Sequence, residues 1–530
     1  MSTDRGTEPS VEAAGTDNSA GALPAGTYLE IEVKYDADDT VELPVLVDLP
    51  GVAAVEQPVE QHLEATYFDT ADLRLAQAKI TLRRRTGGPD AGWHLKLPKA
   101  KGQRLEVHRP LGRATRTVPR ALVDIVRAYV RDQQLAPVAT LHTQRNVHRL
   151  LDRDGAVLAD VADDVVTGER LVIPTPALSW RELEVEAVGG DASLLAAVGA
   201  RLVAAGAQPA SSASKLARVL GDAVVSPSAP DSDSLGPSVA AGDVVHSYLA
   251  EQVAAIQTWD RSARTDEPDA VHKMRVATRR LRSALATYRR LLDRTVTDPV
   301  RDELRWIGQV LGGPRDAEVL LARVRKLVAG QPRDLVLGPV RRRVDLELRR
   351  RHRDAHARMV EELNGERYFR LLDDLSGLVA TPPFIGDFDR KAKKALPRLV
   401  KRTHRRVVSI AEEAAAESTP AHHEELLHDV RKAAKRARYA GESVAPALGE
   451  AAVSYAAGME NLQEVLGEHQ DSAVTRALLL ELGVQAHLAG ENGFTFGRLH
   501  GLEQARGERA VERYDGALAA VRDRPAWLDG

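Results

Sequence analysis

The sequence predicts an α+β protein of two domains, in which an antiparallel β barrel is followed by an entirely helical half. Within residues 27–222, apolar and charged residues alternate in short runs, the pattern of antiparallel strands, with helical insertions near 119–132 and 191–206. From residue 240 onward the chain is rich in Ala, Leu and Arg with a 3.6-residue apolar period, which is typical of helices. Acids outnumber bases before residue 240 and bases outnumber acids after it, so charge separates at the same place.

Two stretches of biased composition set the domain boundaries. Residues 1–26 are rich in Gly, Ser, Thr, Ala and acid, a composition that predicts a disordered tail. The stretch S-P-S-A-P-D-S-D-S-L-G-P-S predicts a linker within residues 223–239. The expected domains are the barrel at 27–222 and the helical domain at 240–530, the latter as two repeats at about 240–385 and 386–530.

The overall composition excludes several classes of protein. With 43% hydrophobic and 28% charged residues, the chain has the composition of a globular protein. No run approaches the roughly 18 apolar residues of a membrane span, and the first residues lack the pattern of a secretory signal, so we expect a cytoplasmic protein. The absence of cysteine excludes disulfides, a thiolate nucleophile and a zinc site built on cysteine.

The first predicted strand, L-E-I-E-V-K-Y at Leu29–Tyr35, carries a row of charge on one face. Glu30, Glu32 and Lys34 project opposite the apolar residues, with the two carboxylates about 6–7 Å apart along the strand. Other charged faces occur in I-T-L-R-R-R-T, W-H-L-K-L-P-K and R-E-L-E-V-E-A, on Arg83, Arg85, Lys96, Glu182, Glu184 and Glu186. Because these faces contain almost no Ser, Asn or Gln, they favour a closed barrel with a charged interior over a solvated sheet.

A barrel interior of this kind has the composition of a site that processes phosphate. Carboxylates are preferred ligands of divalent cations. Arginine binds phosphate through two parallel hydrogen bonds and lysine binds it as a point charge. Acids that hold a metal on one wall, facing bases on another, are therefore suited to phosphate chemistry.

Six motifs, in order, resemble the CYTH domains, the triphosphate tunnel metalloenzymes. E-I-E-V-K at Glu30–Lys34 resembles the E-x-E-x-K signature of that family. The others are Y-F-D-T (Tyr67–Thr70), L-R-R-R-T-G-G (Leu82–Gly88), L-K-L-P-K (Leu95–Lys99), E-L-E-V-E (Glu182–Glu186) and S-K-L-A-R (Ser214–Arg218). The resemblance covers about residues 27–220 and implies an eight-stranded tunnel.

The same resemblance implies roles for the charged residues. Mg²⁺ or Mn²⁺ would be bound by Glu30, Glu32, Asp160, Glu182 and Glu184. The phosphates of the substrate would be bound by Lys34, Arg83, Arg85, Lys96, Arg145 and Lys215. Catalysis would rest on Glu30, Glu32 and Lys34, whereas Glu186 fits either a metal ligand or a solvated rim residue.

A basic helical segment occurs twice in the C-terminal half. V-H-K-M-R-V-A-T-R-R-L-R and L-H-D-V-R-K-A-A-K-R-A-R have the same spacing of basic residues, 156 residues apart. The corresponding pairs are His272 and His428, Arg275 and Arg431, Arg279 and Lys435, and Arg282 and Arg438. On a helix each set falls within an arc of about 80° and forms a stripe. L-G-G-P-R-D at Leu311–Asp316 likewise corresponds to L-G-E-H-Q-D at Leu466–Asp471, which indicates two tandem units.

The basic stripes predict a polyanionic ligand. Nearby acids would relieve the repulsion on a solvated helix face, yet residues 270–292 and 390–406 contain none. Aromatic residues make up only 4% of the chain and none interrupts the stripes, so stacking of nucleic-acid bases is unsupported. Contacts to the backbone of RNA or DNA remain an alternative.

This half resembles the CHAD domain, the conserved-histidine α-helical module, over about residues 240–530. Such domains bind inorganic polyphosphate with basic helices, and the resemblance implies the same for this chain. Carried over by position, the ligands would be His272, Arg275, Arg279, Arg282, His428, Arg431, Lys435 and Arg438. Because Gln470 stands at the counterpart of Arg315, and Lys435 at that of Arg279, we expect the second unit to bind less tightly.

Together the resemblances imply a divalent-metal-dependent hydrolase of inorganic triphosphate, or of a related triphosphate or polyphosphate, joined to a polyphosphate-binding domain. One alternative is a non-catalytic protein that binds polyphosphate and targets polyphosphate granules. Another is an adenylyl cyclase, which needs a pocket for the base that the sequence does not show. The expected partners are triphosphate or polyphosphate and a divalent cation, with nucleic acid the less favoured polyanion and no membrane.

Overall fold

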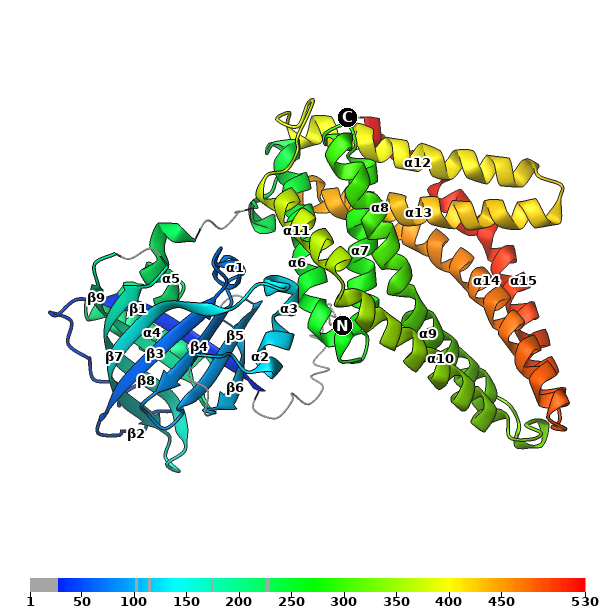
Figure 1. Cartoon of the computed structure of the whole chain (residues 1–530). Helices are drawn as coiled ribbons and strands as arrows, with labels where there is room; N and C mark the ends of the chain where they lie inside the picture. The colour runs from blue at the N-terminus through cyan, green and yellow to red at the C-terminus, as the bar shows by residue number, and fades with distance from the viewer. Residues whose placement is uncertain (1–26, 101–102, 113–115, 173–174, 225–228, 530) are drawn as a thin grey trace, which may run out of the picture. The chain divides into compact units, whose positions relative to one another are not determined.

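The structure, a computed structural model, describes residues 27–529 apart from 101–102, 113–115, 173–174 and 225–228 (Figure 1). The expected tail and part of the expected linker lie outside the described residues. The chain forms two compact units, one made of residues up to Val123 with Gln133–Val225, the other of Asp124–Asp132 with residues from Ser226 onward. Among the described residues, no helix is both long and apolar enough to cross a membrane.

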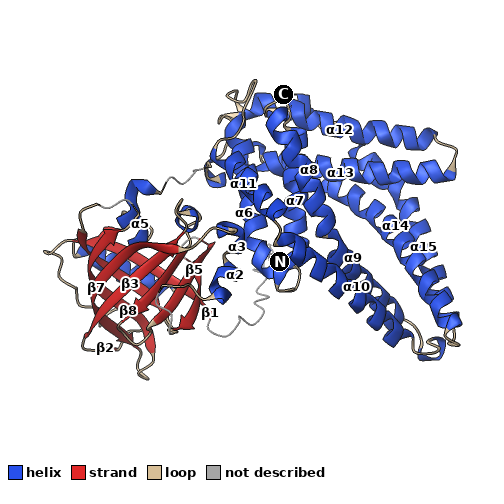
Figure 2. Cartoon of the chain, viewed as in Figure 1, coloured by secondary structure: helices blue, strands red, loops and turns tan. Residues whose placement is uncertain are grey.

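Eight antiparallel strands close into a barrel in the first unit, which confirms the predicted fold (Figure 2). They are β1 (Thr27–Ala37), β3 (Val59–Asp69), β4 (Thr81–Thr86), β5 (Gly92–Ala100), β6 (Gln103–Pro110), β7 (Ala136–Leu151), β8 (Val157–Arg170) and β9 (Leu178–Ala187). The order around the ring is β1-β6-β5-β4-β3-β7-β8-β9, and β9 pairs back with β1. Two short strands, β2 (Ala54–Val55) and β10 (Gln208–Pro209), add to β7 and β1.

The first strand closes the barrel by partial pairing on each side. Residues Thr27–Ile31 of β1 pair with β6, whereas Glu32–Ala37 pair with β9. In this register Lys34 lies opposite Glu184. Residues opposite each other in an antiparallel ladder project to the same side of the sheet, so the charged row of β1 and the acids of β9 share the barrel interior.

Apolar residues on the outer face of the barrel are covered by helix α4 (Ala192–Ala204). Leu183 and Val185 of β9 pack there in one buried cluster with Val198 of the helix. The helix begins at Asp191, whose carboxylate accepts hydrogen bonds from the first free backbone N–H groups, as is typical of an N-cap. Shorter helices are α1 (Arg74–Gln77), α2 (Arg120–Ile125), α3 (Arg127–Val130) and α5 (Lys215–Leu220).

The aspartate of the Y-F-D-T motif has a structural role. Asp69 is buried, and its carboxylate accepts hydrogen bonds from the backbone N–H groups of Thr70, Leu75 and Ala76 at 2.7, 2.9 and 2.9 Å. Burial nevertheless raises the pKa of this carboxyl to about 6. The motif residue thus fixes the turn that leads into α1 and does not face the barrel cavity.

From residue 229 onward, the described part of the second unit consists of helices and the loops between them (Figure 2). The helices are α6 (Ala241–Arg264), α7 (Ala270–Thr287), α8 (Arg294–Val310), α9 (Gly312–Ala329), α10 (Val340–Leu363), α11 (Glu366–Ala380), α12 (Ala392–Ala416), α13 (Pro420–Leu448), α14 (Glu450–Leu488) and α15 (Phe494–Arg522). The predicted repeat places α7 and α13 at corresponding positions, since these helices carry the two basic stripes.

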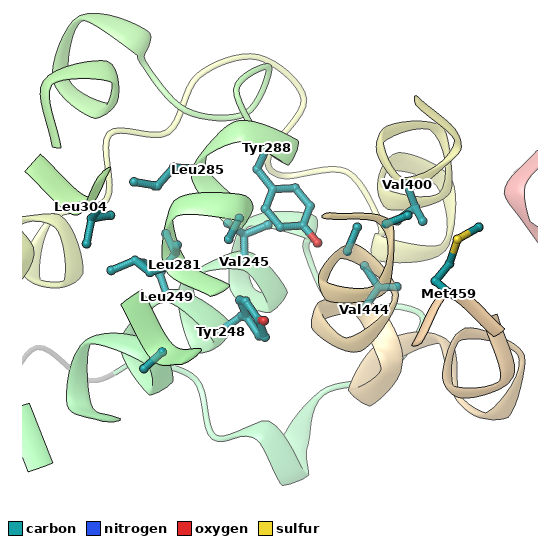
Figure 3. Packing of buried hydrophobic residues seen from close by; sticks show 14 of the residues in the cluster. Val245, Tyr248, Leu249, Leu281, Leu285, Tyr288, Leu304, Val400, Val444 and Met459 are labelled. Carbon is teal, nitrogen blue, oxygen red and sulfur yellow. The ribbon is translucent and has the colours of Figure 1, made fainter. Parts of the chain in front are cut away.

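Residues from both predicted repeats share one hydrophobic core (Figure 3). Leu281 of α7, Val400 of α12 and Val444 of α13 belong to the same buried cluster. Within it, the hydroxyl of Tyr288 makes a 2.5 Å hydrogen bond with Ser443, so the one polar atom of this ring is satisfied. The two halves of the helical unit therefore fold around a common core.

The repeats differ where the first contains a proline. In the first repeat, α8 ends at Val310 and α9 begins at Gly312, with Pro314 in the first turn of α9. Proline lacks an N–H group and clashes with the preceding turn, so it is better accommodated in the first turn of a helix than further along it. The second repeat has His469 at the corresponding position, and helix α14 continues through that residue.

Candidate functional site

A cavity inside the barrel is lined almost entirely by charged and hydroxyl-bearing side chains. Seven bases and five acids contribute to it, together with Tyr28, Tyr67, Thr81 and Ser214. The bases are Lys34, Arg83, Arg85, Lys96, Arg104, Arg145 and Lys215, and the acids are Glu30, Asp90, Glu106, Glu184 and Glu186. Since no aliphatic side chain lines the cavity among the described residues, its ligand must be strongly polar.

Three carboxylates on neighbouring strands converge at one wall of the barrel. One oxygen from each of Asp164, Glu182 and Glu184 lies within 4.8 Å of the others. Lys215 Nζ lies 2.9, 2.7 and 2.7 Å from them, and Arg145 Nη2 lies 2.6 Å from both Asp164 and Glu184. Although Glu184 is buried, the charges of Lys215 and its neighbours hold its pKa well below the usual range.

Glu30 and Glu32 form a second acidic pair, on β1. Glu30 contacts Lys96, while Lys34 Nζ lies 2.9 Å from Glu32 and also contacts Glu184. Burial raises the pKa of Glu30, whereas the charges of Lys34 and Lys96 outweigh the burial of Glu32 and lower its pKa. Within the described part of the chain, Glu30 Oε2 and Glu32 Oε1 are buried without a hydrogen-bond partner, so each carboxylate has a spare acceptor.

The structure brings most of the predicted tunnel residues together. All six predicted phosphate ligands line the cavity, namely Lys34, Arg83, Arg85, Lys96, Arg145 and Lys215. Glu30 and Glu184 line it too, and Glu32 and Glu182 contact its bases. Glu186, which the sequence leaves between two roles, also lines the cavity.

Asp160 is the exception among the predicted metal ligands. It faces Glu186 across the β8–β9 ladder, its side chain is 31% exposed, and the nearest base is Arg149 at 3.7 Å. Asp164 lies four residues further along β8, opposite Glu182. The structure therefore gathers Asp164 with Glu182 and Glu184, whereas Asp160 lies opposite Glu186.

Glu106 lines the cavity, although its sequence pattern is that of an ordinary strand residue. Glu106 is buried in the cavity wall, 2.5 Å from His94 Nδ1 and 3.3 Å from Lys96 Nζ. Despite its burial, the hydrogen bond with His94 and the charge of Lys96 lower its pKa. Its position between apolar residues in R-L-E-V-H-R is the one sequence signal that could have identified it.

The basic wall opposite the acids is held in place before any ligand binds. Arg83 Nη1 donates a 3.3 Å hydrogen bond to the hydroxyl of Tyr67, a residue of β3. Arg85 forms an ion pair with Asp90. These contacts limit the conformations of two arginines that line the cavity.

In the helical unit, the two predicted basic stripes meet where α7 packs against α13. Arg279 Nε donates a 2.7 Å hydrogen bond to the hydroxyl of Tyr439 on α13. Burial lowers the pKa of Arg431, and the charges of Arg279 and Arg275 lower it further. We refer to Arg275, Arg279, Arg431 and Lys435 as the central basic cluster.

The central basic cluster is poor in neutralising acids. Arg275 lies 3.8 Å from Asp316, whereas in the described residues no carboxylate lies within 4.0 Å of Arg279, Arg431 or Lys435. Burial lowers the pKa of Lys435 to about 7, and the charges of Arg431 and Arg279 add to the effect. The like charges therefore repel one another in a way that a bound anion would relieve.

The same local arrangement supports an arginine in each repeat. A β-carbon added at Gly312 would lie 3.6 Å from Arg275 Nη2, and one added at Gly467 would lie 3.1 Å from Arg431 Nη2. The contact at Gly312 would be an ordinary one, whereas the contact at Gly467 would be tighter than most, so glycine leaves room for the Arg431 guanidinium in the second repeat.

The remaining predicted members of the stripes differ in their environments. His272 and His428 are partly buried, and burial lowers the pKa of both imidazoles. Arg438 donates a 2.7 Å hydrogen bond to Glu442 and lies 2.6 Å from Glu460. Arg438 is thus engaged in ion pairs, unlike its counterpart in the first repeat.

Two known families match the chain, one over the barrel and one over the helical half. The CYTH domain matches residues 28–219, and the CHAD domain matches residues 247–480. The chain belongs to the CYTH and CHAD families. CYTH proteins are metal-dependent triphosphatases and cyclases, and the acidic cluster of this CYTH domain is able to bind a metal. The Mycobacterium tuberculosis protein Rv2226 shares 39% identity over 504 residues, which cover 93% of this chain and 96% of the relative.

Several solved structures match parts of the chain. PptA from Streptomyces chartreusis matches with a TM-score of 0.45 and 19% identity, over 54% of this chain and 100% of its own. The CHAD domain from the plant Ricinus communis matches with a TM-score of 0.44 and 23% identity, over 57% and 96%. A putative adenylate cyclase from Bacillus halodurans matches with a TM-score of 0.25 and 18% identity, over 36% and 98%.

Proposed function

We propose that the CYTH domain hydrolyses inorganic triphosphate, or a related triphosphate or short polyphosphate, with a divalent cation, and that the CHAD domain binds polyphosphate. The composition of the tunnel carries this proposal, because seven bases share one cavity with five acids. A site that only bound anions would be weakened by carboxylates facing the phosphates, whereas a metal site requires them.

The carboxylates of the tunnel fit a hard cation such as Mg²⁺ or Mn²⁺. Glu30 and Glu32 each have a buried oxygen without a hydrogen-bond partner in the described structure. Glu182 and Glu184 provide further oxygens beside Asp164, which replaces Asp160 in this proposal. When bound, the cation would act as a Lewis acid toward a phosphoryl oxygen.

The bases of the tunnel would bind and orient the phosphate chain. Lys34, Arg83 and Arg145 can donate to its oxygens and stabilise the negative charge that develops as the P–O bond breaks. Because ion pairs and Tyr67 already hold these side chains, little reorganisation is needed when substrate enters. A carboxylate oxygen left free of the cation would orient the attacking water and accept its proton.

In the CHAD domain, the polyphosphate chain would lie across the central basic cluster. The adjoining His272, Arg282 and His428 would extend the contact, whereas we assign Arg438 to ion pairs within the fold. A linear polyanion suits a row of bases without matching acids, since binding releases counterions and relieves repulsion. Binding of this kind would associate the protein with polyphosphate granules.

The proposal is tested by measuring phosphate release from inorganic triphosphate, ATP and long-chain polyphosphate side by side, with and without Mg²⁺ or Mn²⁺. Metal-dependent release from triphosphate is the expected result. Binding of all three without turnover would instead identify a polyphosphate-binding protein whose tunnel acts as a sensor. Formation of cyclic AMP from ATP would identify a cyclase.

Arg83→Ala is expected to raise the KM for triphosphate by about tenfold or more, with a smaller change in kcat, because it removes a phosphate contact and leaves the metal ligands in place. Steady-state kinetics at saturating metal measure both constants. The matched control is Arg84→Ala, since Arg84 lies opposite Trp93 in the β4–β5 ladder and projects away from the cavity. Equal KM values for Arg83→Ala and the control would contradict the assignment.

Above about pH 7, the full-length protein is expected to take up a proton when it binds polyphosphate. The pKa of Lys435 is about 7 without ligand because it is buried beside Arg431, Arg279 and Arg275, with Asp471 only partly offsetting them. A bound anion raises this pKa, so affinity is highest below about pH 7 and declines as the pH rises above it.

Calorimetry near pH 8 in buffers of different ionisation enthalpy measures this proton uptake directly. Lys435→Arg provides the control, because arginine stays charged across this range and should bind without taking up the proton. The same uptake in Lys435→Arg would show that another group is responsible.

A further inference from the structure

A second basic cavity lies in the CHAD domain, apart from the central basic cluster. Its volume of about 450 Å³ is within the range of about 300–1,000 Å³ that is common for ligand sites. Residues of α8, α12 and α13 and of the end of α7 form its walls. Its six bases, which define the α12 pocket, are Arg289, Arg301, Arg402, Arg406, Lys432 and Arg436.

Only two of the six bases have an acidic partner. Lys432 Nζ lies 2.9 Å from Asp429, and Arg301 Nη1 lies 2.6 Å from Asp298. Among the described residues, no carboxylate lies within 4.0 Å of the other four bases, Arg289, Arg402, Arg406 and Arg436. Arg402 is partly buried and the other three are exposed at the cavity rim, so these four guanidinium groups are available to an anionic ligand.

The repulsion within the α12 pocket is visible in the ionisation of its arginines. Burial lowers the pKa of Arg436, and the charges of Arg301 and Arg406 lower it further. For Arg402 the same two causes apply, with Arg289 among the neighbouring charges. These side chains therefore lie close enough together to act on a single ligand.

Arg282 links the α12 pocket to the central basic cluster. Apart from burial, the charges that lower the pKa of Arg282 include Arg436, from the pocket, and Arg279, from the cluster. The distance along α7 from Arg279 to the end of the helix at Thr287 is about 12 Å. The two groups of bases are also neighbours on α13, where Lys432 and Arg436 of the pocket directly follow Arg431 and Lys435 of the cluster.

We propose that the α12 pocket is a second phosphate-binding site, which holds a further segment of the same polyphosphate chain that crosses the central basic cluster. The inference rests on the proposed function of the CHAD domain. Two neighbouring groups of bases suit a linear polyanion, whereas the apolar lining residues of the pocket, such as Leu399 and Ile410, include no aromatic ring for a nucleic-acid base to stack on.

The test compares two double variants of the full-length protein for affinity toward long-chain polyphosphate, without divalent metal and across a salt series. Arg402→Gln with Arg406→Gln removes two pocket charges from α12. It is expected to lower the affinity about tenfold or more and to make the dependence of log affinity on log salt shallower by about one to two units. Arg349→Gln with Arg353→Gln removes two exposed charges with the same spacing from α10 and should change neither quantity appreciably.

A third double variant, Arg275→Gln with Arg279→Gln, separates this inference from the function on which it rests. Loss of affinity in both the pocket and the cluster variants supports a shared chain. If the cluster variant loses affinity and the pocket variant behaves like the α10 control, the pocket proposal is overturned and the CHAD function stands. If neither loses affinity, the proposed function of the CHAD domain is itself overturned.

Discussion

Glu32→Gln is expected to lower metal-dependent phosphate release from inorganic triphosphate on the order of 10³-fold, because a bound metal supplies several kcal/mol of transition-state stabilisation. Glu32 has a buried oxygen without a hydrogen-bond partner in the described structure, and it lies on the strand that faces the acids of β9. The amide has the same size and can still accept a hydrogen bond from Lys34, so the barrel should remain folded. Glu30→Gln should have a similar effect.

Phosphate release at increasing Mg²⁺ or Mn²⁺ concentration measures this loss, and thermal unfolding shows whether the fold is intact. The matched control is Glu64→Gln, because Glu64 is exposed on β3 and lies opposite Thr86, on the outer face of the barrel. Unchanged turnover at saturating metal in both Glu30→Gln and Glu32→Gln would reject the assignment of these carboxylates to the metal.

Reversing charge at Arg275 and Arg279 together is expected to reduce polyphosphate affinity about 100-fold or more at physiological salt. Both residues belong to the central basic cluster, and glutamate at either position would pair with Arg431 and Lys435 instead of leaving them to the ligand. The dependence of affinity on salt should also become shallower, since fewer counterions are displaced. The fold should survive, because the change replaces repulsion with attraction.

Titration with long-chain polyphosphate across a salt series, with duplex RNA as competitor, measures this effect. The control reverses Arg349 and Arg353, which are exposed on α10 and have the same four-residue spacing. Equal losses in the two double variants would point to a diffuse dependence on net charge. Equal affinity for duplex RNA would favour a nucleic-acid ligand.

The fold could be predicted closely because its strands and helices have distinct apolar periods. Alternation with period 2 and charge on the inner face identify the barrel, and the 3.6-residue period with two matched basic segments identifies the helical unit. The break between α8 and α9 was less accessible, since the corresponding stretch of the second copy, which has His469 in place of Pro314, lies within the continuous helix α14.

The positions of individual acids were harder to predict than the walls that carry them. Asp160 and Asp164 lie on the same face of β8, so period alone cannot separate them. The choice depends on which of them lies opposite Glu182, and cross-strand register is a property of the folded sheet. In the helical unit, Arg438 on α13 likewise forms an ion pair with Glu460 on α14, and a contact between two helices cannot be predicted from the local sequence pattern.

The first strand is held by a short ladder on each side and should open more readily than the β7–β8 pair. β1 pairs with β6 only over Thr27–Ile31 and with β9 only over Glu32–Ala37, whereas β7 and β8 pair along Ala139–Leu151. Local opening costs least free energy where the fewest ladder hydrogen bonds must break. The proposed cation and phosphate contacts on this strand require the closed barrel, so bound ligands would stabilise the closed state. Amide hydrogen exchange in β1 should therefore be fast in the free protein and slow sharply when metal and triphosphate are bound.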